Sequence, residues 1–90
     1  MKFEIPNIFS PNEDGINDYW RPKITNETCL GDYSLVVFNR DGQLFFETNV
    51  FDVSWNGEKA ANGAYYYILR YTNAYTRNEF YEKGIVYVTR

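Results

Sequence analysis

A hairpin pattern in the middle of this 90-residue chain constrains the fold more than any other feature. Residues 33–40 and 43–48 each have the length and residue types of a strand, and Asp41 and Gly42 form a strong turn signal between them. The side of the first strand that carries its polar residues is expected to face solvent, so the other side faces the core. The predicted core-facing residues are Tyr33, Leu35, Val37, Leu44 and Phe46.

The remaining segments fit the same strand architecture. Further strands are predicted at residues 2–8, 19–24, 64–72, 79–83 and 85–90, with Gly84 as a break or bulge between the last two. No helical periodicity of useful length is present, and turns recur every eight to twelve residues. We therefore predict a single domain over residues 1–90 with an all-β, immunoglobulin-like sandwich of about seven strands. Its other core-facing residues are Tyr65, Tyr67, Leu69, Tyr71, Val86 and Val88, with Trp55 closing one end.

The outer face of this predicted sheet is unusually apolar. Scattered exposure of single apolar residues is normal, but a docking patch for another protein or for a preceding domain is the alternative. The residues assigned to the outer face are Val36, Phe38, Phe45, Tyr66, Ile68, Ile85 and Tyr87.

Composition excludes several classes of function. The net charge of −3, with dispersed acidic and basic residues, argues against a nucleic-acid partner. No run is long enough to insert into a membrane, and no secretory peptide is visible after Met1, which we interpret as the start of a fragment of a larger protein. With Cys29 as the single cysteine and no histidine, the usual nucleophile and base pairs and nitrogen or sulfur zinc sites cannot form. We predict no enzymatic activity.

A polar loop within residues 5–20 combines turn formers and carboxylates with flanking aromatic residues. Three interpretations apply: a network of Asx turns between two strands, a cation site, and a recognition surface. For a cation, the oxygen-rich pattern around Gly15 is typical of calcium loops. A true EF-hand is excluded, because aligning Gly15 with its glycine position puts Ser10 at the opening Asp and Arg21 at the closing Glu. A nonstandard calcium site is predicted at Asn12, Asp14, Asn17 and Asp18, and no other cofactor.

Several motifs in order resemble one known family. FSPNEDGIND (9–18) resembles the FTPNGDGVND signature of the gliding motility-associated C-terminal domain, the type B sorting domain of the type IX secretion system in Bacteroidota. VVFNRDGQLFFET (36–48), VSWNG (53–57), NGAYYYIL (62–69) and KGIVYVTR (83–90) resemble its later motifs. Three positions depart from the family pattern: Glu13 replaces a common Gly, Asp41 a Trp, and Asn56 an Asp, which weakens metal binding by that second loop.

The resemblance implies a C-terminal sorting signal. Such a domain is carried by a large cargo protein, is recognised in its folded form by the type IX machinery, and has an outer-membrane protein of the PorP or SprF type as its partner. The cargo then passes through the periplasm and outer membrane to the cell surface or the medium. The resemblance assigns partner recognition to Asn12, Asp14, Gly15, Asn17, Asp18, Arg40, Gly42, Trp55, Gly57, Gly63, Lys83, Gly84 and Arg90.

Two other classes remain open at this stage. A carbohydrate-binding module would stack sugars on exposed aromatic rings, for which Trp20, Trp55 and Tyr66 are the candidates. A structural or adhesive surface module would use the loop around Asp14 only to bind calcium and gain stability.

Overall fold

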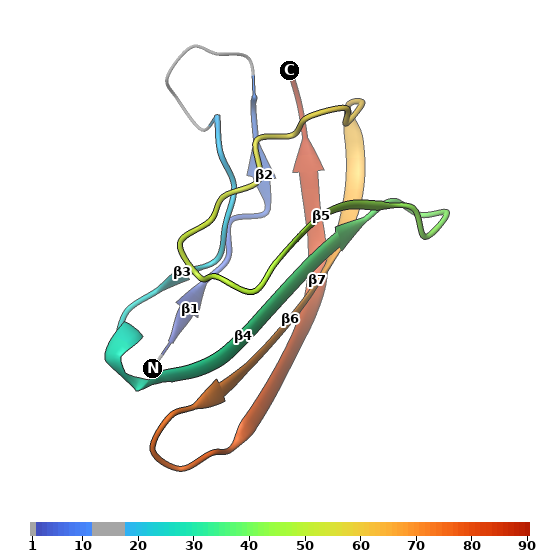
Figure 1. The fold of residues 1–90 in the computed structure, drawn as a ribbon. Coiled ribbons are helices and arrows are strands. Elements are labelled where there is room, and N and C mark those ends of the chain that lie inside the picture. Colours follow the sequence, from blue (N-terminus) through green and yellow to red (C-terminus); the bar gives the residue numbers. More distant parts are fainter. Residues whose placement is uncertain (1, 12–17) are drawn as a thin grey trace.

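The computed structural model describes residues 2–11 and 18–90, and strands form almost all of its regular structure (Figure 1). One turn of 3-10 helix, η1 (Glu27–Cys29), is the exception within these residues. The all-β prediction with about seven strands is confirmed. The strands are β1 (Phe3–Glu4), β2 (Ile8–Phe9), β3 (Lys23–Ile24), β4 (Leu30–Phe38), β5 (Leu44–Thr48), β6 (Gly63–Asn73) and β7 (Glu79–Val88).

The long sheet has the strand order β2-β7-β6-β4-β5. Its pairs are antiparallel except β2 and β7, which run parallel. The second layer consists of the antiparallel pair β1 and β3 and a two-residue bridge between Trp20 and Trp55. Figure 1 shows β1, β3 and the loop between β5 and β6 on one side of the long sheet. This small layer covers the face on which the core forms.

The core follows the alternation of the long strands. Leu35 and Val37 of β4, Leu69 of β6, and Val86 and Val88 of β7 are fully buried, as predicted. Burial of each such side chain contributes roughly 1.5–3 kcal/mol. The predicted tyrosines of β4 and β6 also face this core: Tyr33 and Tyr65 are buried, and Tyr67 and Tyr71 pack against its edge. Burial raises the pKa of Tyr33 to about 12, with the Arg21 charge acting weakly in the opposite direction.

The prediction for β5 is wrong at Leu44 and Phe45. Leu44 is 51% exposed, whereas the Phe45 ring contacts the Tyr65 ring at a centroid distance of 5.1 Å. The cause is a register shift, because Val37 pairs with Phe46 but Phe38 pairs with Leu44, so Phe45 is an extra residue. Such a bulge reverses the parity of the strand beyond it.

The predicted first strand is in fact two strands in different sheets. Phe3–Glu4 pairs with β3, and Ile8–Phe9 pairs with β7. Pro6 lies at the crossing between the sheets, where its missing N–H does not interrupt a ladder. Its carbonyl accepts a 2.6 Å hydrogen bond from Trp20 Nε1. This bond holds the crossing in place.

Gly84 is neither a break nor a bulge. It pairs with Tyr67 in a regular ladder that runs through the whole of β7. A Cβ atom at Gly84 would lie 2.5 to 2.9 Å from three atoms of the Tyr67 side chain. Glycine is therefore required because the Tyr67 ring lies directly over it, and the two predicted strands on either side are one.

Candidate functional site

Three distant segments meet at the end of the sandwich where the chain terminates (Figure 1). Residues after β2, residues after β7, and the loop between β5 and β6 all lie there. Thr89 N donates to Phe9 O at 3.1 Å, and the hydroxyls of Ser10 and Thr89 are 3.1 Å apart. The parallel pairing of β2 with β7 thus continues past both strands and places position 90 beside Pro11.

Arg90 joins these segments through its guanidinium group. Nη1 donates to Pro11 O at 2.9 Å, and Nη2 donates to Gly57 O and Ala60 O, each at 2.7 Å. Its backbone N–H donates to Asn62 Oδ1 at 3.0 Å. We call these four bonds the Arg90 clamp. A planar, permanently charged fork suits this task, because it presents several donors at fixed angles to separate acceptors.

The loop that receives the clamp is a compact turn around Gly57. Gly57 is buried and has φ +73°, and a Cβ there would lie 2.8 Å from Pro11 Cγ. Asn56 Oδ1 accepts from Glu58 N at 2.9 Å, which is an Asx turn. Asn56 thus serves the local backbone, a task that an amide performs as well as a carboxylate.

Two tryptophans anchor the same loop to the second layer. Trp20 and Trp55 exchange backbone hydrogen bonds of 2.8 Å in both directions, and their rings meet edge to face at 6.4 Å. Both side chains are at most 2% exposed. Trp55 closes the sandwich as predicted, and a stacking platform of Trp20 or Trp55 for sugars is wrong because both side chains are almost completely buried.

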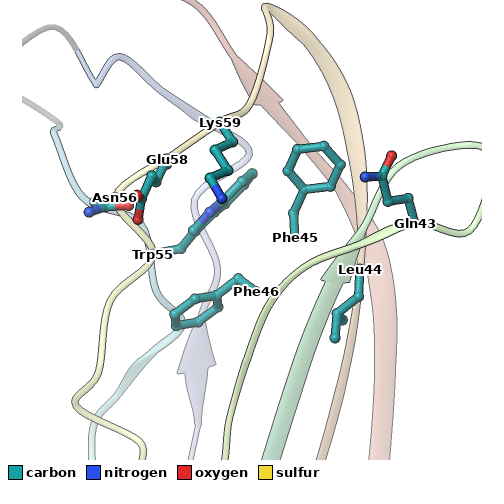
Figure 2. Close-up of a pocket in the computed structure, with 8 residues that line it drawn as sticks. All are labelled: Gln43, Leu44, Phe45, Phe46, Trp55, Asn56, Glu58 and Lys59. Carbon is teal, nitrogen blue, oxygen red and sulfur yellow. The ribbon is translucent and has the colours of Figure 1, made fainter.

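A groove of about 440 Å³ runs between this loop and the edge strand β5 (Figure 2). Figure 2 shows Trp55 on one side and Phe45 and Phe46 on the other, with Glu58 and Lys59 from the loop. The indole N–H of Trp55 has no hydrogen-bond partner in the described part of the chain. A buried indole N–H usually donates a hydrogen bond. This unpartnered donor belongs to a side chain that lines the groove.

A second depression, of about 740 Å³, lies over the clamp. Tyr19, which is 68% exposed, and the exposed Lys59 belong to its lining. Asp18 lies in its wall. The lining is completed by Pro11, Asn56, Gly57, Glu58 and Arg90. This surface combines an exposed aromatic ring with charges of both signs that include an arginine, and aromatic residues and arginine are enriched in protein–protein interfaces.

The structure brings together only part of the predicted recognition set. Asp18, Gly57 and Arg90 line the depression over the clamp, Trp55 lines the neighbouring groove, and Gly63 pairs with Val88. The other described members lie elsewhere: Arg40 and Gly42 in the β4–β5 hairpin, and Lys83 and Gly84 within β7. Asn12, Asp14, Gly15 and Asn17 lie outside the described residues.

Three contributors to the clamp were not predicted as site residues. Pro11 and Ala60 act through their carbonyls, which every residue has, so the sequence contains no signal for them. Asn62 opens the NGAYYYIL motif but was not among the predicted site residues, and its side chain accepts from the backbone N–H of Arg90.

Residues 2–11 and 18–90 contain no group of three or more His, Cys, Asp or Glu side chains arranged to hold a metal ion. No helix within the same residues is long and apolar enough to cross a membrane.

Comparison with known protein families supports a role in recognition by other proteins. The family model of the CHU_C type IX secretion signal domain matches residues 3–88, which is nearly the whole chain. No match was found among curated proteins. Secretion signal domains are not an enzymatic family, and they act by engaging the type IX machinery, which exports their cargo across the outer membrane to the surface or the medium. The chain belongs to the CHU_C type IX secretion signal domain family and functions as a C-terminal sorting signal.

Proposed function

We propose that this chain is a sorting domain of the type B, gliding motility-associated kind, and that its surface over the Arg90 clamp contacts an outer-membrane protein of the PorP or SprF type. The single observation that carries the proposal is the clamp itself, which joins Pro11, Gly57, Ala60 and Asn62 to Arg90. Four sequence motifs of the resemblance thereby share one surface, which forms only when the chain is folded.

The proposed contact set follows from this arrangement. Its described members are the exposed or half-buried residues that line the depression over the clamp: Pro11, Asp18, Tyr19, Asn56, Glu58, Lys59 and Arg90. Asn12, Asp14, Gly15 and Asn17 join the set on the sequence alone. Arg40, Gly42, Lys83 and Gly84 are left out, because neither the hairpin nor these positions of β7 line the depression over the clamp. The cargo in this proposal is a larger secreted protein that carries the domain at its end.

A pair of exposed tyrosines offers a matched test. Tyr19 lies in the depression and is 68% exposed, whereas Tyr75 is 76% exposed in the turn between β6 and β7. Figure 1 shows that this turn is at the opposite end of the sheet from the C-terminus. In this test a reporter is fused to the chain, with upstream residues of the parent protein added, and the fusion is expressed in a host that has the type IX system. Tyr19→Ala is expected to reduce the exported fraction severalfold, because loss of an aromatic side chain that a partner covers on binding typically costs more than about 1 kcal/mol.

The control for this test is Tyr75→Ala, which is expected to be exported like the unaltered chain. Periplasmic levels and melting temperatures of both variants are measured so that a folding defect is recognised. Equal export of the two variants would place the contact elsewhere on the domain. Retention of the unaltered fusion in the periplasm would contradict the sorting role of these residues.

We further propose that calcium binds the loop that contains Asn12, Asp14, Asn17 and Asp18. The support is the sequence pattern, since only Asp18 lies within the described residues. At ten times its dissociation constant, calcium would add about 1.4 kcal/mol of stability. For a domain of this size that gain raises the melting temperature by roughly 5–10 °C. The rise is expected to vanish in Asp14→Ala and with chelator, and to persist in Asp52→Ala, a loop residue elsewhere in the chain. An unchanged melting temperature in millimolar calcium would reduce the loop to Asx turns.

A further inference from the structure

The face of the long sheet that points away from the second layer carries a continuous apolar row. Register places Leu44 of β5, Phe38 of β4, Tyr66 of β6 and Ile85 of β7 side by side across four strands. Leu44 is 51% exposed and Ile85 40% exposed, and the rings of Phe38 and Tyr66 stack between them at 6.1 Å. The bulge in β5 contributes to this row, because it turns Leu44 outward in place of Phe45.

The neighbouring row on the same face has a charge at each end. In the same strand order it reads Glu47, Val36, Ile68 and Lys83. Glu47 and Lys83 are separated by three strand spacings, roughly 14 Å, so they cannot pair with each other within one chain. Each is exposed at the border of an apolar strip. Two opposite charges placed symmetrically about the midline of the strip are a pattern that a second copy would complement.

We propose that this outer face is an interface between two copies of the chain, related by a twofold axis that runs parallel to the strands between β4 and β6. This operation places β5 over the partner copy's β7 and β4 over its β6. Each member of the apolar row then meets an apolar residue, and each Glu47 meets a Lys83 of the partner copy. Every such contact occurs twice, as an isologous interface requires.

The geometry of sheet packing tolerates this arrangement. Aligned sheets cross at about 30°. Glu47 and Lys83 lie one and a half strand spacings, roughly 7 Å, from the proposed axis. The crossing angle therefore displaces each charge from its partner by roughly 4 Å along the strands, which the long Glu and Lys side chains can span.

A further charge of the face agrees with the same axis. Arg70, the next charged residue along β6, pairs in register with Ser34 of β4 and with Tyr81 of β7. The twofold operation places Arg70 over Ser34 of the second copy, so no like charges meet. A different dimer, formed by hydrogen bonds between the free β5 edges of two copies, is disfavoured because the bulge interrupts that edge.

The size of the face sets the expected affinity. The face spans four strands about 4.8 Å apart. Taken over four successive rows of outward-facing residues about 6.8 Å apart, it covers roughly 500 Å² per copy. Such an area is at the low end for specific interfaces, so a dissociation constant in the micromolar range is expected. The proposal concerns self-association and is independent of the surface over the Arg90 clamp.

Charge reversal tests the proposal by analytical ultracentrifugation of the 90-residue chain. Glu47→Lys alone places lysine opposite Lys83 twice, and Lys83→Glu alone places glutamate opposite Glu47 twice. Each variant is expected to dimerise about tenfold more weakly than the unaltered chain. An equimolar mixture of the two is expected to recover the original affinity, because every lysine then meets a glutamate. Glu27→Lys, in η1 away from the face, is the matched control and is expected to change nothing.

A second variant tests the apolar row. Ile85→Asp introduces a charge at a 40% exposed position of β7 and is expected to abolish dimerisation with little loss of fold, checked by its circular dichroism and melting temperature. A chain that stays monomeric up to several hundred micromolar overturns the proposal. A dimer that persists in Ile85→Asp, or a mixture of the charge variants that does not recover, shows that any association uses another surface and equally overturns it.

Discussion

Replacing Gly57 by alanine is expected to lower the free energy of unfolding by about 3–4 kcal/mol, through two separate effects. The backbone at Gly57 has φ +73°, a conformation that costs an L-residue roughly 1–2 kcal/mol. The new Cβ would also lie 2.8 Å from Pro11 Cγ and 3.2 Å from Phe9 Cζ. Relief of this clash would move Pro11 away from Arg90. Guanidinium denaturation followed by tryptophan fluorescence measures the loss.

Gly42 provides the matched control for this prediction. It has a similar backbone angle, φ +83°, but no atom lies within 4 Å of the position of its missing Cβ. Gly42→Ala is therefore expected to cost only the conformational part, roughly 1–2 kcal/mol. The difference between the two variants measures the packing of the Gly57 turn against residues before the polar loop. Equal losses would show that this packing contributes no stability.

The sequence was sufficient to predict the strands of the long sheet and most of its core. Alternation assigned Leu35, Val37 and Leu69 to the buried face because each lies in a strand with at least one polar residue on the opposite side. The same rule failed at Leu44 and Phe45, since all the residues from Leu44 to Phe46 are apolar and hydropathy alone does not reveal an extra residue. It failed again at Gly84, where the missing side chain leaves room for the Tyr67 ring of the neighbouring strand and the strand does not bend.

The candidate site was less accessible to sequence reasoning. Its side chains could be selected from the resemblance, but their grouping depends on a parallel pairing between β2 and β7 that joins residues about 80 positions apart in the chain. The acceptors of the Arg90 clamp are largely backbone carbonyls, which no pattern of residue types identifies. The recognition residues assigned from the resemblance also included Lys83, which lies on the outer face. The position of a residue in a motif does not show whether it lies near the clamp.

The clamp gives the second prediction of large effect. Arg90→Ala is expected to lower the free energy of unfolding by roughly 2–3 kcal/mol, since hydrogen bonds from charged donors contribute about 1.5–3 kcal/mol each and these are partly exposed. The carbonyls of Gly57 and Ala60 would lose a charged donor that reaches them at 2.7 Å. The backbone bond from Arg90 to Asn62 does not use the side chain and is expected to remain. Chemical denaturation at two salt concentrations measures the effect.

Arg90→Lys separates the shape of the donor from its charge. A lysine keeps the positive charge but presents a single ammonium group, which cannot reach carbonyls on both sides as the planar guanidinium does. We therefore expect Arg90→Lys to lose most of the stability lost by Arg90→Ala, and salt to change the difference little, because short hydrogen bonds are screened less than distant charges. Arg40→Ala, in the exposed hairpin, is the control and is expected to stay within about 0.5 kcal/mol of the unaltered chain. Full stability in Arg90→Lys would mean that Arg90 acts through its charge alone, and the three carbonyl contacts would then not hold this end of the sandwich together.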